Sequence, residues 1–230
     1  MSKQVIMLFG APGAGKGTQA EILSDKTGYY HLESSNVIET CFNRENLEKV
    51  FRVDGKDYKL SDEKKLRETG LLMSPPFVVF LMEEKIKELA QEGKGIIFSG
   101  SPRTVYEAEK EIPLLKELYG VENLKFILLE IAPETTIFRN SHRRICELIR
   151  HSILFSSETE KLTKCPLDGS DLVRRKKLDD PDVIKKRIEI FKEESLPVIK
   201  IMEKEGVHVH RINGEQSVAD VFRDVQEALK

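Results

Sequence analysis

A glycine-rich loop near the start of the chain has the composition of a phosphate-binding site. It reads Gly-Ala-Pro-Gly-Ala-Gly-Lys-Gly-Thr from Gly10 to Thr18. Glycines allow backbone angles and close approaches that other residues do not, so successive amide N–H groups can converge on phosphate oxygens. Lys16 can reach the β- and γ-phosphates, and the Thr18 hydroxyl can face Mg²⁺. The residues expected to bind a nucleoside triphosphate here are Gly10, Gly13, Ala14, Gly15, Lys16, Gly17 and Thr18.

The segments on either side of this loop are those that a phosphate site needs. The continuous apolar run 5–9 predicts a strand that is buried on both faces. A helix is expected to begin near Lys16 and to end at Gly28, with Lys26 in its last turn. The N-terminus of that helix would place its partial positive charge beside the phosphates.

The rest of the chain alternates apolar runs with helical patterns. Such alternation predicts an α/β three-layer sandwich, in which helices cover both faces of a parallel sheet. Pro197 is expected to perturb a long helix over 181–204. Other helices are expected at 77–93, 105–118, 133–145 and 218–229, and strands at 29–32, 95–98, 124–131 and 207–212.

Two segments interrupt this alternation. Residues 34–73 are irregular and charged, with a turn signal at Asp54-Gly55, and we expect a small helical insertion there. Residues 148–172 have no clear period and contain Pro166 and Gly169, so we expect a loop or lid.

The composition narrows the functional class. A net charge of −2 with interspersed signs argues against nucleic acid or a membrane surface as the main partner. The start of the chain has no apolar stretch long enough for a signal peptide, and no segment is long and apolar enough to span a membrane. The three cysteines are far apart, as in proteins of a reducing cytoplasm. A cytoplasmic protein is therefore expected.

The loop departs from the general phosphate-loop pattern in one respect, since Gly17 stands where Ser or Thr usually follows the lysine. With this offset, GAPGAGKGTQA resembles the signature of adenylate kinases and their relatives among the nucleoside monophosphate kinases. The segment Ser99-Gly-Ser-Pro-Arg103-Thr104 resembles the Asp-Gly-Phe-Pro-Arg-Thr segment of that family, and the resemblance covers essentially the whole chain. Other matching positions are Arg139, Arg143 and Arg144 before the lid, Arg175, Asp179, Asp180 and Arg187 after it, and the late turn Asn213-Gly-Glu-Gln216.

The resemblance implies a monomeric phosphate-loop kinase that uses Mg²⁺ and catalyses ATP + AMP ⇌ 2 ADP. Phosphoryl transfer spreads negative charge over equatorial oxygens, so catalysis is mostly positioning and charge stabilisation. Gln216 is implied to lie near the adenine of ATP. Arg139 and Arg143 are implied to contact the phosphates of ATP. The implied catalytic residues are Lys16, Arg103, Arg139, Arg143 and Arg187. The residues implied to bind the monophosphate are Ser34, Glu39, Leu71, Met73, Gly100, Arg103, Glu107, Arg175, Lys176 and Arg187.

The resemblance also implies a division of the chain into three parts. The core would comprise residues 1–33, 74–147 and 173–230. The insertion at 34–73 would bind the monophosphate, and residues 148–172 would close over ATP as the lid.

Two departures from the family concern charge. Ser99 stands where the family has an aspartate that anchors Mg²⁺ through water, so we expect weaker magnesium binding or slower turnover, with Asp179 or Asp180 as compensation. Glu39 stands where the family has an arginine that grips the AMP phosphate. Losing one charged hydrogen bond costs about 1.5–3 kcal/mol, which weakens binding about 10- to 150-fold. Arg44 and Arg52 are candidates to replace that arginine.

A third departure concerns the base of the acceptor. Glu107 falls where a glutamine normally reads adenine, and an ionised carboxylate only accepts hydrogen bonds. Guanine offers two adjacent donors, so GMP would suit Glu107. A kinase of GMP or of a pyrimidine monophosphate is therefore the alternative function. A nucleotide-binding regulatory protein that has lost catalysis is a further alternative, supported by Ser99 and Glu39.

The lid sequence contains part of a zinc motif. Many lids of the family hold zinc with paired cysteine knuckles, and Cys165 and Asp168 resemble the second pair. The first pair has only Cys146, because Ile149 stands at its second position. Structural zinc sites need four ligands, and His151 would complete the set only if the loop bends. The sequence therefore favours a lid without metal. Cys41 is isolated and is expected to be a small core residue.

Overall fold

A computed structural model of the chain describes residues 3–69, 71–149, 151–174 and 180–230. Its centre is a sheet in the order β10-β6-β1-β5-β2, with five strands in the described residues. All neighbouring strands of this sheet run parallel, which confirms the predicted architecture. The bounds are β1 (Val5–Gly10), β2 (Tyr30–Glu33), β5 (Ile96–Ser99), β6 (Leu124–Glu130) and β10 (Val209–Asn213).

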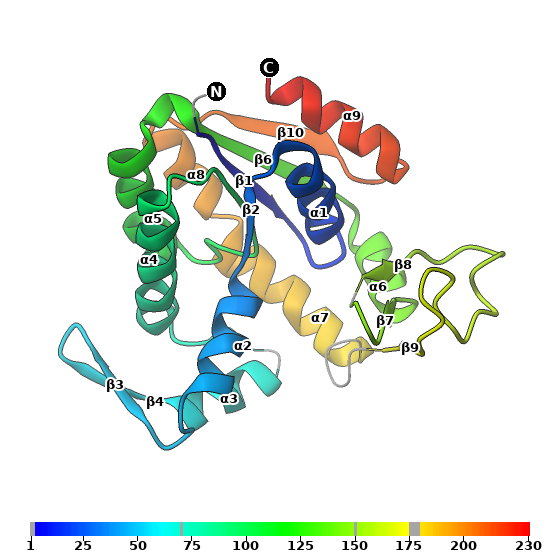
Figure 1. The fold of residues 1–230 in the computed structure, drawn as a ribbon, viewed down its shortest axis with the longest axis horizontal. Helices are drawn as coiled ribbons and strands as arrows, with labels where there is room; N and C mark the ends of the chain where they lie inside the picture. The colour runs from blue at the N-terminus through cyan, green and yellow to red at the C-terminus, as the bar shows by residue number, and fades with distance from the viewer. Residues whose placement is uncertain (1–2, 70, 150, 175–179) are drawn as a thin grey trace.

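Helices cover both faces of the sheet (Figure 1). One face carries α1 (Lys16–Thr27) and α9 (Val218–Ala228), and the other carries α4 (Pro75–Gln91), α5 (Val105–Tyr119) and α8 (Val198–Lys204). The side chains of β1 enter the two cores alternately. Even-numbered residues pack against α1 and α9, and odd-numbered ones pack against α4, α5 and α8. The prediction that this apolar run is a strand buried on both faces is confirmed.

One predicted helix is shorter than expected, and another is interrupted beside Pro197 as predicted. The helix predicted over 133–145 is α6 (Pro133–Ser141), because Ile145 instead pairs with strands of the lid. The helix predicted over 181–204 is divided into α7 (Pro181–Ile190), a π-helical turn η2 (Phe191–Ser195) and α8. The wide turn lies directly before Pro197, which has no N–H to continue the ladder. A short 3₁₀ helix, η1 (Val121–Asn123), precedes β6.

The segment predicted as a helical insertion also contains a hairpin. Its elements are α2 (Ser34–Arg44), β3 (Val50–Val53), β4 (Lys56–Lys59) and α3 (Leu60–Glu68). Asp54 and Gly55 form the two-residue turn, with φ of 50° and 78°, which suits the twist of a hairpin. The insertion contains helices as expected, but the sequence did not indicate the hairpin between them, because four-residue strands are too short to leave a clear pattern.

A small sheet lies in and beside the segment predicted as a loop or lid. Its antiparallel strands, in the order β8-β7-β9, are β7 (Arg144–Cys146), β8 (Ser152–Ile153) and β9 (Leu172–Val173). Strands of two or three residues are too short to leave a period in the sequence. The lid range 148–172 leaves β7 outside it, and the division into core, insertion and lid stays a prediction.

Candidate active site

The phosphate loop joins the end of β1 to the start of α1, as the sequence predicted. Gly10 has φ +143°, and a Cβ there would lie 2.4 Å from the Leu129 carbonyl oxygen on the neighbouring strand β6. Only glycine fits this close approach. The Lys16 ammonium donates to the carbonyl oxygens of Gly10 at 2.7 Å and Ala11 at 3.0 Å. The positive charge of Lys16 is therefore held against the loop, and Thr18 follows it in the first turn of α1.

Helix α6 supports this loop from the side. Arg139 Nη1 donates to the Gly13 carbonyl at 3.3 Å, and Asn140 Nδ2 donates to the Pro12 carbonyl at 3.1 Å. Asn140 is fully buried, and a Cβ on Gly13 would lie 2.7 Å from its amide nitrogen. Arg139 was predicted as a site residue, whereas Asn140 was missed. The available signal was a polar residue on the inward side of an amphipathic helix, next to Arg139.

The structure places the other charged residues that were predicted around the lid in different ways. Arg143 follows the end of α6, and Arg187 lies half-buried on α7, which packs against α6. Arg144 holds the lid backbone, donating to the carbonyls of Glu160 at 3.1 Å and Leu162 at 2.5 Å and to that of Thr159. The predicted residues Arg175, Lys176 and Asp179 lie outside the described part of the chain.

A small cavity of about 50 Å³ lies beyond the end of β5, between α2, α3 and α5. Among its lining residues are six that the sequence assigned to the monophosphate site: Ser34, Leu71, Met73, Gly100, Arg103 and Glu107. Glu39 is absent from the lining described for this cavity and instead pairs with Arg67, which does line it. Arg67 was missed because nothing in the local sequence places α3 against this cavity.

Arg103 is oriented by the end of β5 and the start of α2. Its Nε donates to the Gly100 carbonyl at 2.5 Å, and its Nη2 lies 3.4 Å from Ser34 Oγ. Ser34 Oγ also donates to the Gly100 carbonyl at 2.9 Å. These contacts place a guanidinium and a hydroxyl together at the cavity, which is a suitable arrangement for a phosphate group.

Two buried carboxyl groups lie behind Arg103. Glu107 accepts the Arg103 backbone N–H at 2.6 Å, and Glu111 accepts the Ser101 hydroxyl at 2.8 Å. Burial raises the pKa of Glu107, and burial together with the Glu107 charge raises the pKa of Glu111 well above its usual range. Because one of the two Glu107 oxygens accepts the Arg103 backbone N–H, it is less available to guanine. This weakens the argument that Glu107 recognises guanine.

The predicted magnesium position contains a neutral pair of side chains. Ser99 Oγ lies 2.6 Å from His31 Nε2, a contact that the sequence did not indicate. Burial lowers the pKa of His31, although the nearby Glu33 charge raises it. Glu33 is paired in register with Ser99 on the neighbouring strand. The hydroxyls of Ser99 and Thr18 are neutral oxygen donors, which fit Mg²⁺ held largely through water and phosphate oxygens. Asp180 caps α7 by accepting from the Asp182 N–H.

Four side chains of the lid bring ligand atoms within 4.8 Å of one another: Cys146, His151, Cys165 and Asp168. Cys146 Sγ lies 2.8 Å from an Asp168 oxygen, and Cys165 Sγ lies 3.5 Å from His151 Nε2. Both cysteines are buried. Two sulfur donors, one nitrogen and one oxygen fit a tetrahedral Zn²⁺ site. The fold supplies the bend that brings His151 into the set.

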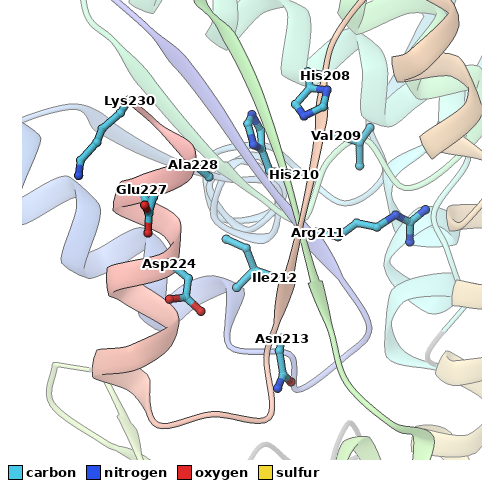
Figure 2. A pocket seen from close by; sticks show the side chains of 10 residues that line it. All are labelled: His208, Val209, His210, Arg211, Ile212, Asn213, Asp224, Glu227, Ala228 and Lys230. Atoms are coloured by element: carbon cyan, nitrogen blue, oxygen red, sulfur yellow. The ribbon is translucent and has the colours of Figure 1, made fainter.

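A larger hollow of about 590 Å³ lies elsewhere, along β10 and α9 at the edge of the sheet. Figure 2 shows its polar lining, which includes His208, His210 and Glu227. Of the late turn that resembles the family's, Asn213 is among the residues described as lining it, but Gln216 is not. Gln216 instead closes the turn between β10 and α9, donating to Asp224 at 2.7 Å. That turn lies beside the phosphate loop, since a Cβ on Gly214 would be 3.5 Å from the Ala14 carbonyl oxygen.

Cys41 lies on α2 and is half-buried against the core. In the described part of the chain, every helix is too short or too polar to cross a membrane.

Comparison with known proteins gives a consistent result. The sequence model of the family described as adenylate kinase matches residues 8–207. Proteins named adenylate kinase from Caldicellulosiruptor saccharolyticus and Caldicellulosiruptor bescii are 29% and 30% identical to this chain, over 97% of it and 98% of their own length. One from Chloroherpeton thalassium is 30% identical over 97% of each chain. The chain belongs to the adenylate kinase family.

Proposed function

We propose that this protein transfers the γ-phosphoryl group of ATP to AMP, giving two molecules of ADP. The observation that supports this proposal best is that two segments suited to bind phosphate follow the carboxyl ends of two paired strands. The loop with Lys16 follows β1, and the turn with Arg103 follows β5, which pairs directly with β1. Ligands bind at this edge in open parallel sheets. A donor and an acceptor phosphate held there would lie close together.

The donor half would bind ATP through backbone and charge. Amide groups of the loop and the N-terminus of α1 attract the phosphates. Lys16 would leave the carbonyls of Gly10 and Ala11 and donate to phosphate oxygens instead. Gln216 belongs to the turn beside Ala14, which supports its assignment near the adenine.

The acceptor half would bind AMP through side chains. Arg103 and Ser34 would hold the monophosphate, and Leu71 and Met73 would supply apolar surface for the base. Arg139, Arg143 and Arg187 would surround the transferring group, since α6 and α7 pack together beside the loop. Arg175 and Lys176 keep their expected role in monophosphate binding as part of this proposal.

The reaction itself needs little covalent chemistry from the protein. An AMP phosphate oxygen attacks the γ-phosphorus, and the bond between that phosphorus and the bridging oxygen of ATP breaks. The arginines stabilise the charge that spreads over the equatorial oxygens. Mg²⁺ neutralises charge on the phosphates when it is bound, and Thr18 and Ser99 would hold its water shell. Closure of the lid would exclude water, so that AMP and not water is the acceptor.

We also propose that the lid holds structural Zn²⁺ through Cys146, His151, Cys165 and Asp168. The sequence favoured a lid without metal because a fourth ligand was uncertain. The convergence of four donor atoms supports the opposite choice. A cytoplasmic location and a monomeric state complete the proposal, as the composition and the family resemblance imply.

A coupled assay for ADP formation with AMP, GMP, CMP and UMP tests the proposal. We expect AMP to be the best acceptor. A preference for GMP or a pyrimidine monophosphate would select the alternative kinase, and no turnover with any acceptor would refute kinase activity. Calorimetry then separates the regulatory alternative: a bisubstrate analogue should bind far more tightly than ATP to an enzyme with both halves intact, and no more tightly to a protein that binds only the triphosphate.

A further inference from the structure

Arg67 occupies a position at the acceptor cavity that nothing in the local sequence indicates. It lies on α3 and lines the same cavity as Arg103 and Ser34. Its Nη1 donates to a Glu39 oxygen on α2 at 2.5 Å. The side chain is 30% exposed, whereas Glu39 is 55% exposed. Arg67 is therefore the more buried partner, and it reaches across from one helix of the insertion to the other.

A second contact fixes the direction of this side chain. The guanidinium carbon of Arg67 lies 5.7 Å from the centre of the Phe42 ring, which is itself buried. Phe42 and Glu39 are one turn apart on α2 and present neighbouring side chains to Arg67. A planar guanidinium that lies over a ring and donates to a carboxylate is pre-organised, so less side-chain entropy is lost on binding.

The charges at the cavity point to an anionic ligand. Two guanidinium groups, those of Arg67 and Arg103, line one small space. Desolvation lowers the pKa of Arg103, the nearby charges of Glu107 and Glu33 raise it, and the positive charge of Arg67 lowers it. A guanidinium has five N–H donors, and the hydrogen bond described between Arg67 and Glu39 uses Nη1 alone. A phosphate dianion between the two arginines would relieve their repulsion and accept from both.

We propose that Arg67 is a phosphate-binding residue for the monophosphate acceptor, held in position by Glu39 and Phe42. This inference rests on the proposed function and names a residue of the same site. It explains how the site tolerates a carboxylate at position 39, because the charge that Glu39 brings is used to orient a cation from the neighbouring helix. Arg52, one of the candidates from the sequence, instead lies 3.9 Å from Asp57 in the exposed hairpin.

The test is calorimetric binding of AMP and of adenosine to the full chain and to Arg67→Ala. We expect the AMP dissociation constant to rise about 10- to 150-fold, as for loss of one charged hydrogen bond. Adenosine lacks the phosphate, so its affinity should change less than about threefold. Arg67→Lys keeps the charge without the planar fork and should recover part of the loss.

Lys64→Ala is the matched control. Lys64 lies on the same helix, 5.9 Å from the same Phe42 ring, but is not among the residues described as lining the cavity. Its loss should leave both affinities within about threefold. The proposal is overturned if Arg67→Ala weakens adenosine as much as AMP, if it leaves AMP binding unchanged, or if the unaltered chain binds no AMP. AMP binding without ADP formation would refute the proposed function. The comparison of AMP and adenosine affinities would still test the role of Arg67.

Discussion

The donor and acceptor halves of the site are built in different ways. The donor half is one continuous segment, Gly10–Thr18, whose backbone is fixed between β1 and α1. The acceptor half is assembled from side chains of α2, α3, α5 and the end of β5, which are far apart in the sequence. In the donor half the backbone itself would bind the phosphates, so it tolerates few substitutions that change its geometry. A side-chain site can exchange one residue for another that approaches from a different element.

Two of the three departures from the family follow this difference, and the third, Ser99, lies at the magnesium position. Glu39 and Glu107 both belong to the acceptor half, and each has found a partner within the protein, Arg67 and the Arg103 backbone. The phosphate loop, by contrast, carries every residue that its geometry requires. Substitutions should therefore separate the two halves experimentally.

The largest effect is expected in the donor half. Lys16→Met should lower kcat by about 10²–10³, because it removes a positive charge from the developing transition state. The AMP dissociation constant should stay within about threefold, since Lys16 donates to the loop and is not among the residues described as lining the cavity. Steady-state kinetics and AMP calorimetry measure the two quantities. An equal loss of AMP affinity would show that the two halves are not separate.

Two glycines of the loop give the next largest contrast. Gly10→Ala should lower the free energy of unfolding by about 2–3 kcal/mol, because φ is +143° and the new Cβ would overlap the Leu129 carbonyl. Gly17→Ala is the control, since it lies in α1 with open space around it, and it should be neutral or stabilise by up to about 1 kcal/mol. Urea unfolding without nucleotide measures both. Similar values for the two variants would contradict a loop fixed by its contact with β6.

The lid should respond to metal removal. Purified protein is expected to contain one Zn²⁺ by mass spectrometry, and chelation should lower Tm by at least about 2–4 °C, which corresponds to about 1 kcal/mol at this length. Cys146→Ser should abolish the bound metal. Cys41→Ser, in α2 and outside the cluster, should retain it. Metal-free protein that cannot be loaded with Zn²⁺ would favour a lid held by its hydrogen bonds alone.

The smallest effect concerns the buried carboxyl behind the acceptor cavity. Because the folded-state pKa of Glu111 lies well above 4.5, the folded protein keeps this proton to higher pH than the unfolded chain does. The free energy of unfolding should therefore fall as pH rises from about 4.5 through the raised pKa. Glu111→Gln should remove this decline and gain about 1 kcal/mol or more at alkaline pH. Glu109→Gln, exposed on the same helix, should keep it. If the free energy of unfolding depended on pH in the same way in both variants, the decline could not be attributed to Glu111.

The parts of the structure that the sequence predicted are determined by interactions between residues that are close in the sequence. The continuous apolar run of β1, the glycine that ends α1 and the turn at Asp54-Gly55 each follow from neighbouring residues. The hairpin, the lid sheet and the end of α6 at Ser141 were missed because short strands leave no period. His31, Arg67 and Asn140 were missed because each acts through tertiary contact: with Ser99 across the sheet, with Glu39 across two helices, and with the Pro12 carbonyl.

The most direct test of the central claim follows the phosphoryl group itself. ATP labelled at the γ-phosphate is mixed with AMP and excess enzyme for a single turnover. The account predicts that the label appears in ADP formed from AMP, with little in inorganic phosphate, because the arginines and the lid direct transfer to the AMP bound at Arg103 and Ser34. Label that remains in ATP, or that passes to inorganic phosphate whether or not AMP is present, would contradict it.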